Sequence, residues 1–304
     1  MTITAVWDDD QKRGQTWADE LGATYYDNLD TLLTSPDVEA VICDAQTTMH
    51  KEVILKAVHA GKHVFTEKAL APTVKECEEM ADAIEKSGIT FTISLPQRTS
   101  PVARLAKKLI DEDVFGKISL VRVRNGHNGV SDGWLPEYWF EKRDAAGGAL
   151  MDLGCHPMYM ATWLLGKPTK ISALLTAPFG SKVDEAATAS IEFENGAVFT
   201  GETSFISYKS PSIIEIYGSD ATFISVDDFI RYSGKNIESL MEHDDITPKL
   251  PEDMPIPIEI FIEACVNGTG TPDMFGPREG VELTRLLENA YISNAESRIV
   301  QLNK

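Results

Sequence analysis

The sequence predicts two domains: an α/β domain built on a parallel sheet, then an α+β domain whose mostly antiparallel sheet is covered by helices on one face. Over the first hundred residues, short β-branched and apolar runs alternate with helical patterns, the order that βαβ units produce. Beyond residue 116, strand candidates follow one another, and Asn195-Gly196 between two of them is a strong hairpin signal. A length of 304 residues fits two domains.

The N-terminal part contains alternating strands and helices. We expect strands at 3–7, 38–43, 62–66 and 89–94. We expect the helices between them at 11–21, 50–59 and 74–87. An amphipathic helix at 101–113 ends before Gly116, where we place the domain boundary. The predicted domains are therefore 1–116 and 117–304.

The C-terminal part is rich in strands. We expect them at 117–124, 171–176, 186–193, 198–204, 212–217 and 222–226. A largely buried helix is expected at 148–165, with Gly166 as its stop, and two more helices near the end of the chain. The uncovered face of such a sheet is large enough to pair subunits.

Composition and charge narrow the classes of function. The chain is 43% hydrophobic and carries a net charge of −19, which argues against nucleic acid and anionic membranes as partners. No apolar run approaches 18 residues, and the start of the chain does not resemble a signal peptide. Its four cysteines are scattered without a C-x-x-C pair, which favours a reduced, cytoplasmic protein over a zinc site. We expect no metal.

The stretch from Gly147 to His156 holds the clearest chemical pair. Asp152 and His156 are four residues apart, which places both side chains on one face of a helix. A carboxylate beside an imidazole orients the ring and supports its charged form, and the ring exchanges protons near neutral pH. The alternative is a structural hydrogen bond between the two residues, since structural pairs also perturb pKa values.

Polar residues follow three predicted strands, where ligands of parallel sheets bind. Asp8 follows the first strand; an acid there binds the ribose hydroxyls of NAD and repels the extra phosphate of NADP, or else it caps the next helix. Two further candidates are a polar stretch after the second strand and a Glu-Lys pair after the third. The alternative for the first is an ordinary polar loop, and the alternative for the second is a surface lysine. The predicted cofactor contacts are Asp8, Ala45, Thr47, His50, Glu67 and Lys68.

Two segments carry a family resemblance. Gly61-Lys62-His63-Val64-Phe65-Thr66-Glu67-Lys68-Ala69 resembles the Gly-x-His-Val strand and Glu-Lys-Pro motif of the Gfo/Idh/MocA family of nicotinamide-dependent sugar and inositol dehydrogenases. Gly147 to His156 is similar to the family's Gly-Gly-x-Leu-x-Asp-x-Gly-x-His segment, and the end of the chain (257–300) resembles the family's end. The resemblance implies an incomplete Rossmann-like domain followed by a substrate-binding α+β domain that pairs subunits into dimers or tetramers.

The resemblance also implies the chemistry. Lys68, Asp152 and His156 would form the catalytic set: His156 takes the proton of a secondary alcohol, Lys68 polarises the same oxygen, and Asp152 orients His156. A base and a cationic donor on one oxygen lower the barrier to hydride removal. The expected cofactor is NAD, with NADP less favoured, and the substrate a sugar, sugar derivative or cyclitol.

The substrate is expected to contact Lys68, Asp152, His156, Tyr159 and Trp139. Trp139 belongs to a loop at 126–143 that is rich in aromatic and polar groups, as sugar pockets are, although a packed surface loop has a similar composition. Asp184, at the start of a strand, is a further candidate.

The chain departs from the family at three places. Ala69 replaces the usual proline, so we expect a trans bond before it. Tyr159 replaces a common aspartate.

The third departure is that the first strand and its Gly-x-Gly-x-x-Gly turn are missing. Either the true start lies upstream, or the cofactor half is rebuilt, with strands 2–7 and 38–43 pairing or a partner filling the gap. The alternative function is accordingly a catalytically silent relative that acts as a binding or regulatory subunit.

Overall fold

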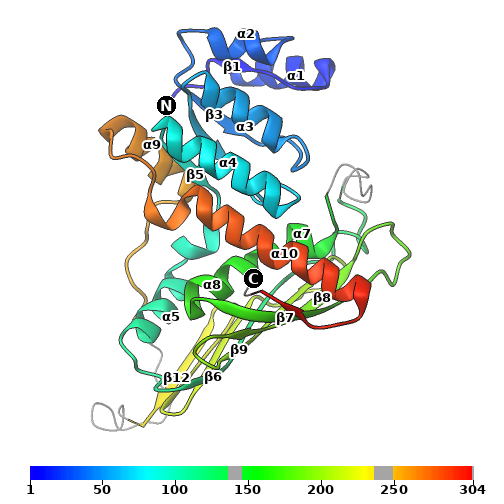
Figure 1. Cartoon of the computed structure of the whole chain (residues 1–304), viewed down its shortest axis with the longest axis vertical. Helices are drawn as coiled ribbons and strands as arrows, with labels where there is room; N and C mark the ends of the chain where they lie inside the picture. The colour runs from blue at the N-terminus through cyan, green and yellow to red at the C-terminus, as the bar shows by residue number, and fades with distance from the viewer. Residues whose placement is uncertain (136–145, 236–248, 303–304) are drawn as a thin grey trace. The chain divides into compact units, whose positions relative to one another are not determined.

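The computed structural model describes residues 1–135, 146–235 and 249–302 (Figure 1). The chain divides into two units. The first consists of Met1–Ser94 and Pro255–Val281, and the second of Leu95–Met254 and Glu282–Lys304.

Parallel strands make up two small sheets in the first unit. One sheet pairs β1 (Ala5–Val6) with β2 (Thr24–Tyr25). The other has the order β3 (Ala40–Cys43), β4 (His63–Thr66) and β5 (Phe91–Ile93). Because β1 and β3 belong to separate sheets in the described part of the chain, the alternative in which they pair was wrong.

Helices surround these strands. They are α1 (Gln11–Leu21), α2 (Leu29–Thr34), α3 (His50–His59), α4 (Val74–Ser87) and α9 (Pro257–Asn267), with a short 3₁₀ turn, η3 (Asp273–Phe275). The core lies around β4 and β5, where Phe91 and Ile93 are fully buried and Phe65 packs against Phe261 of α9 at 5.8 Å between ring centroids. The parallel βαβ pattern predicted from the sequence is confirmed.

In the described part of the second unit, eight strands form one sheet in the order β12-β11-β10-β6-β9-β8-β7-β13. The strands are β6 (Ile118–Gly126), β7 (Pro168–Thr176), β8 (Ala186–Phe193), β9 (Val198–Ser204), β10 (Ile213–Gly218), β11 (Ala221–Val226), β12 (Phe229–Gly234) and β13 (Val300–Gln301). Neighbours are antiparallel except β6 and β9, so the predicted mostly antiparallel sheet is confirmed.

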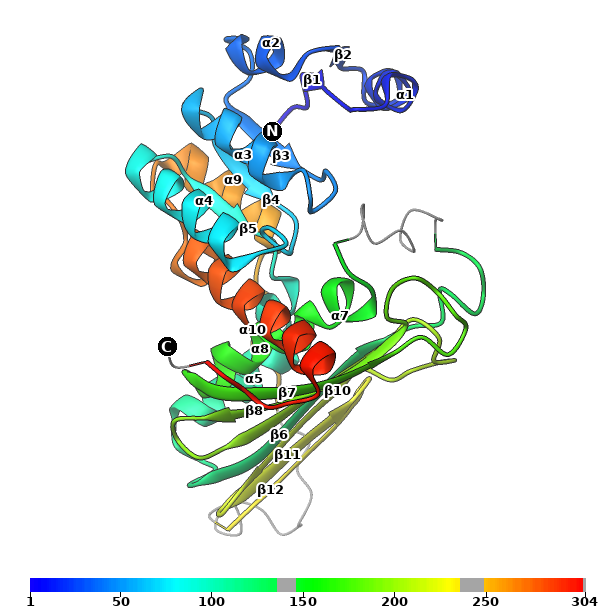
Figure 2. The ribbon, with the colours of Figure 1, turned by 45° about the vertical axis from the view of Figure 1, so that its right-hand side comes forward.

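Helices cover one face of this sheet (Figure 2). They are η1 (Pro96–Thr99), α5 (Pro101–Asp111), α7 (Ala149–Asp152) and α8 (Cys155–Leu165), together with the part of α10 (Pro277–Glu296) that belongs to this unit. Helix α8 packs so tightly on β9 that a methyl group at Gly201 would meet Pro157 at 3.1 Å and Met158 at 3.2 Å. Glycine in this strand therefore permits the close approach of α8.

The observed division of the chain differs from the predicted boundary at residue 116. Helix α5 belongs to the second unit, with Ala103 and Ala106 buried, and residues 255–281 return to the first. The return has a packing reason, because Phe261 of α9 completes the core beside Phe65. A linear reading of the sequence cannot assign such a returning segment.

The single helix predicted at 148–165 was wrong. The chain instead makes α7 and α8, separated by Leu153 and Gly154. Pro157 has no N–H to donate to the carbonyl of Leu153, and its ring would collide with that carbonyl in a continuous helix. The N–H of His156 instead donates to the carbonyl oxygen of Leu153 at 3.2 Å, and His156 lies in the first turn of the new helix α8.

No helix within the described residues combines the length and the apolar character that crossing a membrane requires.

Candidate functional site

The carboxylate of Asp8 follows β1 and is held by Arg13. Arg13 donates to it from Nε at 2.7 Å and from Nη2 at 2.6 Å, and the N–H of Asp10 donates at 2.8 Å. Although burial opposes the effect, these hydrogen bonds hold the pKa of Asp8 below its ordinary value. The N-cap of α1 is Asp10, so the alternative role of Asp8 as the helix cap was wrong.

The ends of β3 and β4 adjoin each other and carry most of the other predicted cofactor contacts. The N–H of Glu67 donates to the carbonyl of Cys43 at 3.1 Å. Ala45 and Thr47 after β3, and Glu67 and Lys68 after β4, therefore belong to neighbouring segments at the carboxyl edge of one sheet.

His50 connects these two segments from the start of α3. Its Nε2 lies 2.9 Å from the carbonyl oxygen of Ala45, and its Nδ1 lies 3.0 Å from that of Ala69 and 3.2 Å from that of Leu70. Burial lowers the pKa of His50, although the carbonyl groups and Glu67 act in the opposite direction. With 1% of its surface exposed, His50 supports the two segments, and its direct contact with a cofactor stays a prediction.

The peptide bond between Lys68 and Ala69 is cis, so the predicted trans bond was wrong. Ala69 and Leu70 are buried, at 1% and 0% exposure, and their carbonyl oxygens face the ring of His50. Packing around this segment thus accommodates an alanine in the place where the resemblance has proline.

In the second unit, Asp184 holds the start of α7. Its carboxylate accepts the N–H of Gly148 at 3.0 Å, the N–H of Leu150 at 2.7 Å and the hydroxyl of Tyr291 at 2.9 Å. Burial raises the pKa of Asp184, against these hydrogen bonds. Asp184 is thereby engaged in holding the segment that carries Asp152, a role that its position in the sequence did not suggest.

His156 lies at the start of α8 and meets a buried tyrosine. Its Nδ1 is 2.8 Å from the hydroxyl oxygen of Tyr159, one turn further along the helix. Tyr159 is 0% exposed, and its hydroxyl oxygen also accepts the N–H of Gln97 at 3.1 Å. The ring of His156 is therefore fixed from the protein side through Nδ1.

Arg98 secures that tyrosine. Its Nη2 donates to the main-chain oxygen of Tyr159 at 3.2 Å, and its guanidinium lies 5.7 Å from the centre of the Tyr159 ring and 6.0 Å from that of Trp163. A guanidinium over aromatic faces is attracted by their quadrupoles. Arg98 is 1% exposed, so this buried cation helps to hold Tyr159, the tyrosine that contacts His156.

His127, just after β6, lies within electrostatic range of Asp152. Burial lowers the pKa of His127, and the charge of Asp152 acts in the opposite direction. The ring stacks on Phe205 at 5.2 Å and packs against Trp134 at 4.7 Å, while its Nδ1 accepts the N–H of Gly129 at 3.1 Å. These contacts hold His127 at the start of the predicted substrate loop, near enough to Asp152 for their charges to interact. Trp139 lies outside the described residues.

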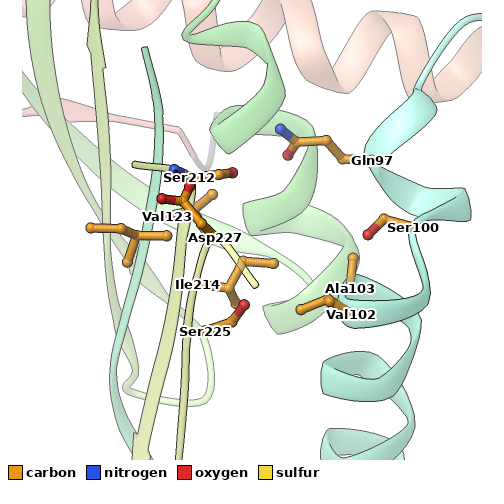
Figure 3. Close-up of a pocket in the computed structure, with 10 residues that line it drawn as sticks. Gln97, Ser100, Val102, Ala103, Val123, Ser212, Ile214, Ser225 and Asp227 are labelled. Atoms are coloured by element: carbon orange, nitrogen blue, oxygen red, sulfur yellow. Dashed lines mark hydrogen bonds between the residues drawn. The ribbon is translucent and has the colours of Figure 1, made fainter. Parts of the chain in front are cut away.

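A cavity of about 150 Å³ lies between η1, α5 and the sheet (Figure 3). Gln97, Ser100 and Val102 line one side, and Ser212 and Ser225 belong to the other. The main-chain N–H of Gln97 also donates to the hydroxyl of Tyr159, so the cavity shares a residue with the contacts that hold His156.

The sequence predicted candidate chemical residues and did not predict the residues that hold them in place. The structure brings Asp8 to one strand end, and Ala45, Thr47, His50, Glu67 and Lys68 to another edge, all in the first unit. Asp152, His156 and Tyr159 lie in the second. The convergence of Lys68 with Asp152 and His156 stays a prediction.

Three supporting residues were missed: Gln97, Arg98 and Tyr291. The first two follow β5, so the reasoning applied to three strand ends, extended to the fourth, would have found them. No comparable signal marks Tyr291 within α10.

Family comparisons match both parts of the chain. Residues 1–95 match the family described as "Oxidoreductase family, NAD-binding Rossmann fold". Residues 103–224 match the "GFO/IDH/MocA C-terminal domain".

Similar proteins include several that act on sugars. Levoglucosan dehydrogenase of Pseudarthrobacter phenanthrenivorans is 28% identical over 64% of this chain and 57% of its own length. The 2,7-anhydro-N-acetylneuraminate hydratase of Mediterraneibacter gnavus is 35% identical over 46% of this chain and 37% of its own length. The match thus spans between about a third and three fifths of these two relatives.

A solved structure, "Levoglucosan dehydrogenase, complex with NADH and levoglucosan", shares the fold. Its TM-score is 0.86 at 23% identity, with 100% of this chain and 91% of that chain covered. The two family matches, the parallel βαβ sheet and the large antiparallel sheet agree. The chain belongs to the Gfo/Idh/MocA oxidoreductase family.

Proposed function

We propose that this protein transfers a hydride between NAD and a secondary alcohol of a sugar, a sugar derivative or a cyclitol. The observation that carries the proposal is the arrangement around His156, which lies in the first turn of α8 with its Nδ1 held 2.8 Å from the hydroxyl oxygen of the buried Tyr159. The names of the relatives support the substrate class, since levoglucosan dehydrogenase and D-xylose dehydrogenase are among them.

The residues of the first unit fit a nicotinamide dinucleotide at two places. Asp8 is an ionised carboxylate at a strand end with 16% of its side chain exposed, which suits the hydroxyl pair of an adenosine ribose. Glu67 and Lys68 stand beside Ala45 and Thr47 at the edge that would hold the nicotinamide end. When bound, the cofactor supplies the hydride acceptor. Asp8 favours NAD because a carboxylate repels the additional phosphate of NADP.

The proposed roles in the reaction are divided among three side chains. His156 removes the hydroxyl proton, and a general base of this kind contributes about 10²–10⁴-fold in rate. Lys68 donates a hydrogen bond to the same oxygen and stabilises its developing negative charge. Asp152 supports the charged form of His156 from α7, and Tyr159 and Trp139 complete the predicted substrate contacts.

The decisive experiment combines cofactor binding with turnover. We expect NADH titration to raise the melting temperature of the protein. We also expect some members of a panel of polyols and aldoses, incubated with NAD, to produce the absorbance of reduced nicotinamide. His156→Ala is expected to lower turnover by at least about 10²-fold with the NADH affinity retained. His59→Ala, an exposed histidine at the end of α3, is the matched control.

Two results would contradict this function. Absence of any response to millimolar NADH or NADPH would favour a catalytically silent binding subunit. Equal loss of NADH binding and turnover in His156→Ala would give that residue a structural role.

We further propose a cytoplasmic homo-oligomer that pairs through the sheet of the second unit. The four cysteines are all free thiols, and three of them are buried, which suits a reducing compartment. The sheet face opposite the helices exposes large apolar side chains, among them Leu120, Leu174 and Phe229.

A further inference from the structure

The cavity between η1, α5 and the sheet (Figure 3) is lined by residues of the second unit. Its deeper part is buried, since Ala103 and Val123 are each 1% exposed and Ser225 is 4% exposed. Its rim includes the exposed Asp227. A volume of about 150 Å³ has room for about five water molecules or for one ligand of about the size of benzene. The cavity is therefore large enough for a small organic molecule.

Ser225 places a hydroxyl group in an apolar part of the sheet. Its strand, β11, alternates so that Ala221, Phe223 and Ser225 form the buried face, each at most 5% exposed. Across the sheet, Ser225 lies between Ile214 of β10 and Ile230 of β12. A buried hydroxyl without a hydrogen bond costs free energy. Within the described residues the Ser225 hydroxyl has no hydrogen-bond partner, so its partner is expected inside the cavity.

Two further polar side chains come from the opposite wall. Ser100 is the N-cap of α5, where serine is preferred because its side-chain oxygen accepts an N–H of the first turn. Its side chain makes no such capping bond here, and Ser100 lines the cavity. Gln97 directs its amide across the cavity toward Ser212 and Asp227 (Figure 3). Hydrogen-bonding groups therefore face the cavity from both walls.

The rim opposite Gln97 is held in place by two hydrogen bonds. Asp227 connects β11 to β12 and has a left-handed backbone, with a φ of 49°. Its Oδ1 accepts the N–H of Ser212 at 2.9 Å, and its own N–H donates to the carbonyl oxygen of Ser212 at 2.9 Å. The two side chains are thus placed beside the cavity before any ligand binds.

The lining selects for a neutral ligand that has both carbon and hydroxyl groups. Aliphatic surface comes from Val102, Val123 and Ile214, and hydrogen-bonding groups come from the serines, the glutamine and the aspartate. In the part of the chain that the structure describes, no lysine or arginine lines the cavity, and the carboxylate of Asp227 repels anions. Water would satisfy the hydroxyls but not the aliphatic wall, whereas a polyol matches both surfaces.

We propose that this cavity is a binding site for a small neutral polyol of about six non-hydrogen atoms. The site is separate from the predicted catalytic residues, because neither Asp152 nor His156 lines it. The proposal does not depend on the proposed function, since binding requires neither NAD nor turnover. Gln97 connects the two places: its side chain lines the cavity, and its main-chain N–H donates to the hydroxyl of Tyr159 at 3.1 Å.

The test uses glycerol as the ligand and isoleucine methyl groups as the reporter. Ile214 lines the cavity, and the spectrum of Ile214→Val assigns its NMR signal. In the whole chain without cofactor, we expect glycerol to shift this signal in a saturable manner, with a Kd in the millimolar range. Benzene, which binds apolar cavities of this volume, is expected to leave the signal in place. Absence of a saturable glycerol shift would overturn the proposal, whatever the result with benzene.

Variants of the lining locate the bound glycerol. Ser225→Ala removes one hydrogen-bonding group and should weaken glycerol binding about twofold to tenfold, the effect of one neutral hydrogen bond. Ala103→Leu extends an isobutyl group from α5 into the cavity and should abolish the saturable shift. If Ala103→Leu does not fold, Ser225→Ala decides the question alone.

The matched control is Ser190→Ala, which removes the hydroxyl of an exposed strand serine on β8 in the same unit. We expect its glycerol affinity to equal that of the wild type. Equal affinities of the wild type and Ser225→Ala would overturn the proposal, as would an equal loss of affinity in Ser225→Ala and Ser190→Ala.

Discussion

His50 couples the two strand-end segments of the first unit through a ring that is neutral when folded. Burial lowers its pKa from the ordinary value of 6.5, so below about pH 6.5 the unfolded chain binds a proton that the folded chain resists. The free energy of unfolding should therefore be level above this pH and fall below it, by at most about 1.4 kcal/mol per pH unit for one group. Urea unfolding between pH 5 and 7.5 measures the slope.

His50→Gln should flatten this dependence, and His59→Gln, on the exposed end of the same helix, should leave it unchanged. Wild type and His50→Gln losing stability in parallel on acidification would contradict a neutral, buried His50. The carbonyl oxygens of Ala45 and Ala69 favour the charged ring, so the experiment also decides whether burial outweighs them.

At the residue scale, the sequence predicted candidate chemical groups but not the residues that hold them in place. Asp152, His156 and Lys68 stand in motifs whose spacing is visible along the chain. The groups that hold them are far away in sequence, since Gln97 is 62 positions from Tyr159 and Asp184 is 36 from Gly148. Such contacts depend on how strands and helices pack, which local patterns do not encode.

At the scale of elements, the start of α7 depends on a glycine that has no room for a side chain. A methyl group at Gly148 would overlap the main-chain oxygen and nitrogen of Asp184, which are backbone atoms and cannot rotate away. We expect Gly148→Ala to cost several kcal/mol, because overpacking combines with loss of the Asp184 hydrogen bonds. Thermal unfolding measures the loss, and turnover should fall with it because α7 carries Asp152.

Gly276→Ala is the control for this substitution. Its φ of −73° suits alanine, and the nearest atom to the added methyl is 3.6 Å away, so stability should change by less than about 0.5 kcal/mol. Equal effects of the two substitutions would mean that Gly148 matters only through chain entropy and not through its contact with Asp184.

Periodicity predicted the long elements and missed the short ones. The helices at 11–21, 50–59 and 74–87 match α1, α3 and α4, because their apolar faces and caps are local signals. Strands β1 and β2 have two residues each, and their existence depends on a partner strand. The break between α7 and α8 follows from Pro157, which disrupts the preceding turn. The spacing of Asp152 and His156 suggests a continuous helix and therefore conceals this break.

At the scale of the whole molecule, the net charge of −19 makes two copies repel, so any interface between them must be locally balanced. The open sheet face of the second unit meets this condition, because Arg122 and Arg124 pair with Glu202, and Arg122 also pairs with Glu215. Because these charges are paired, the apolar side chains of this face can pack against the same face of a second copy.

Leu174 tests that interface, since it is 75% exposed on β7 and alternates with the buried Ala173. A lysine there would bury an unpaired charge in an assembled sheet face, and we expect Leu174→Lys to raise the dissociation constant at least tenfold and shift the protein toward monomer at micromolar concentration. Val266→Lys, at 79% exposure on α9 of the first unit, should leave the assembly unchanged. Light scattering after size exclusion distinguishes the cases: a monomeric wild type excludes pairing through this face, and an equal shift by both lysines would point to added charge rather than to the sheet.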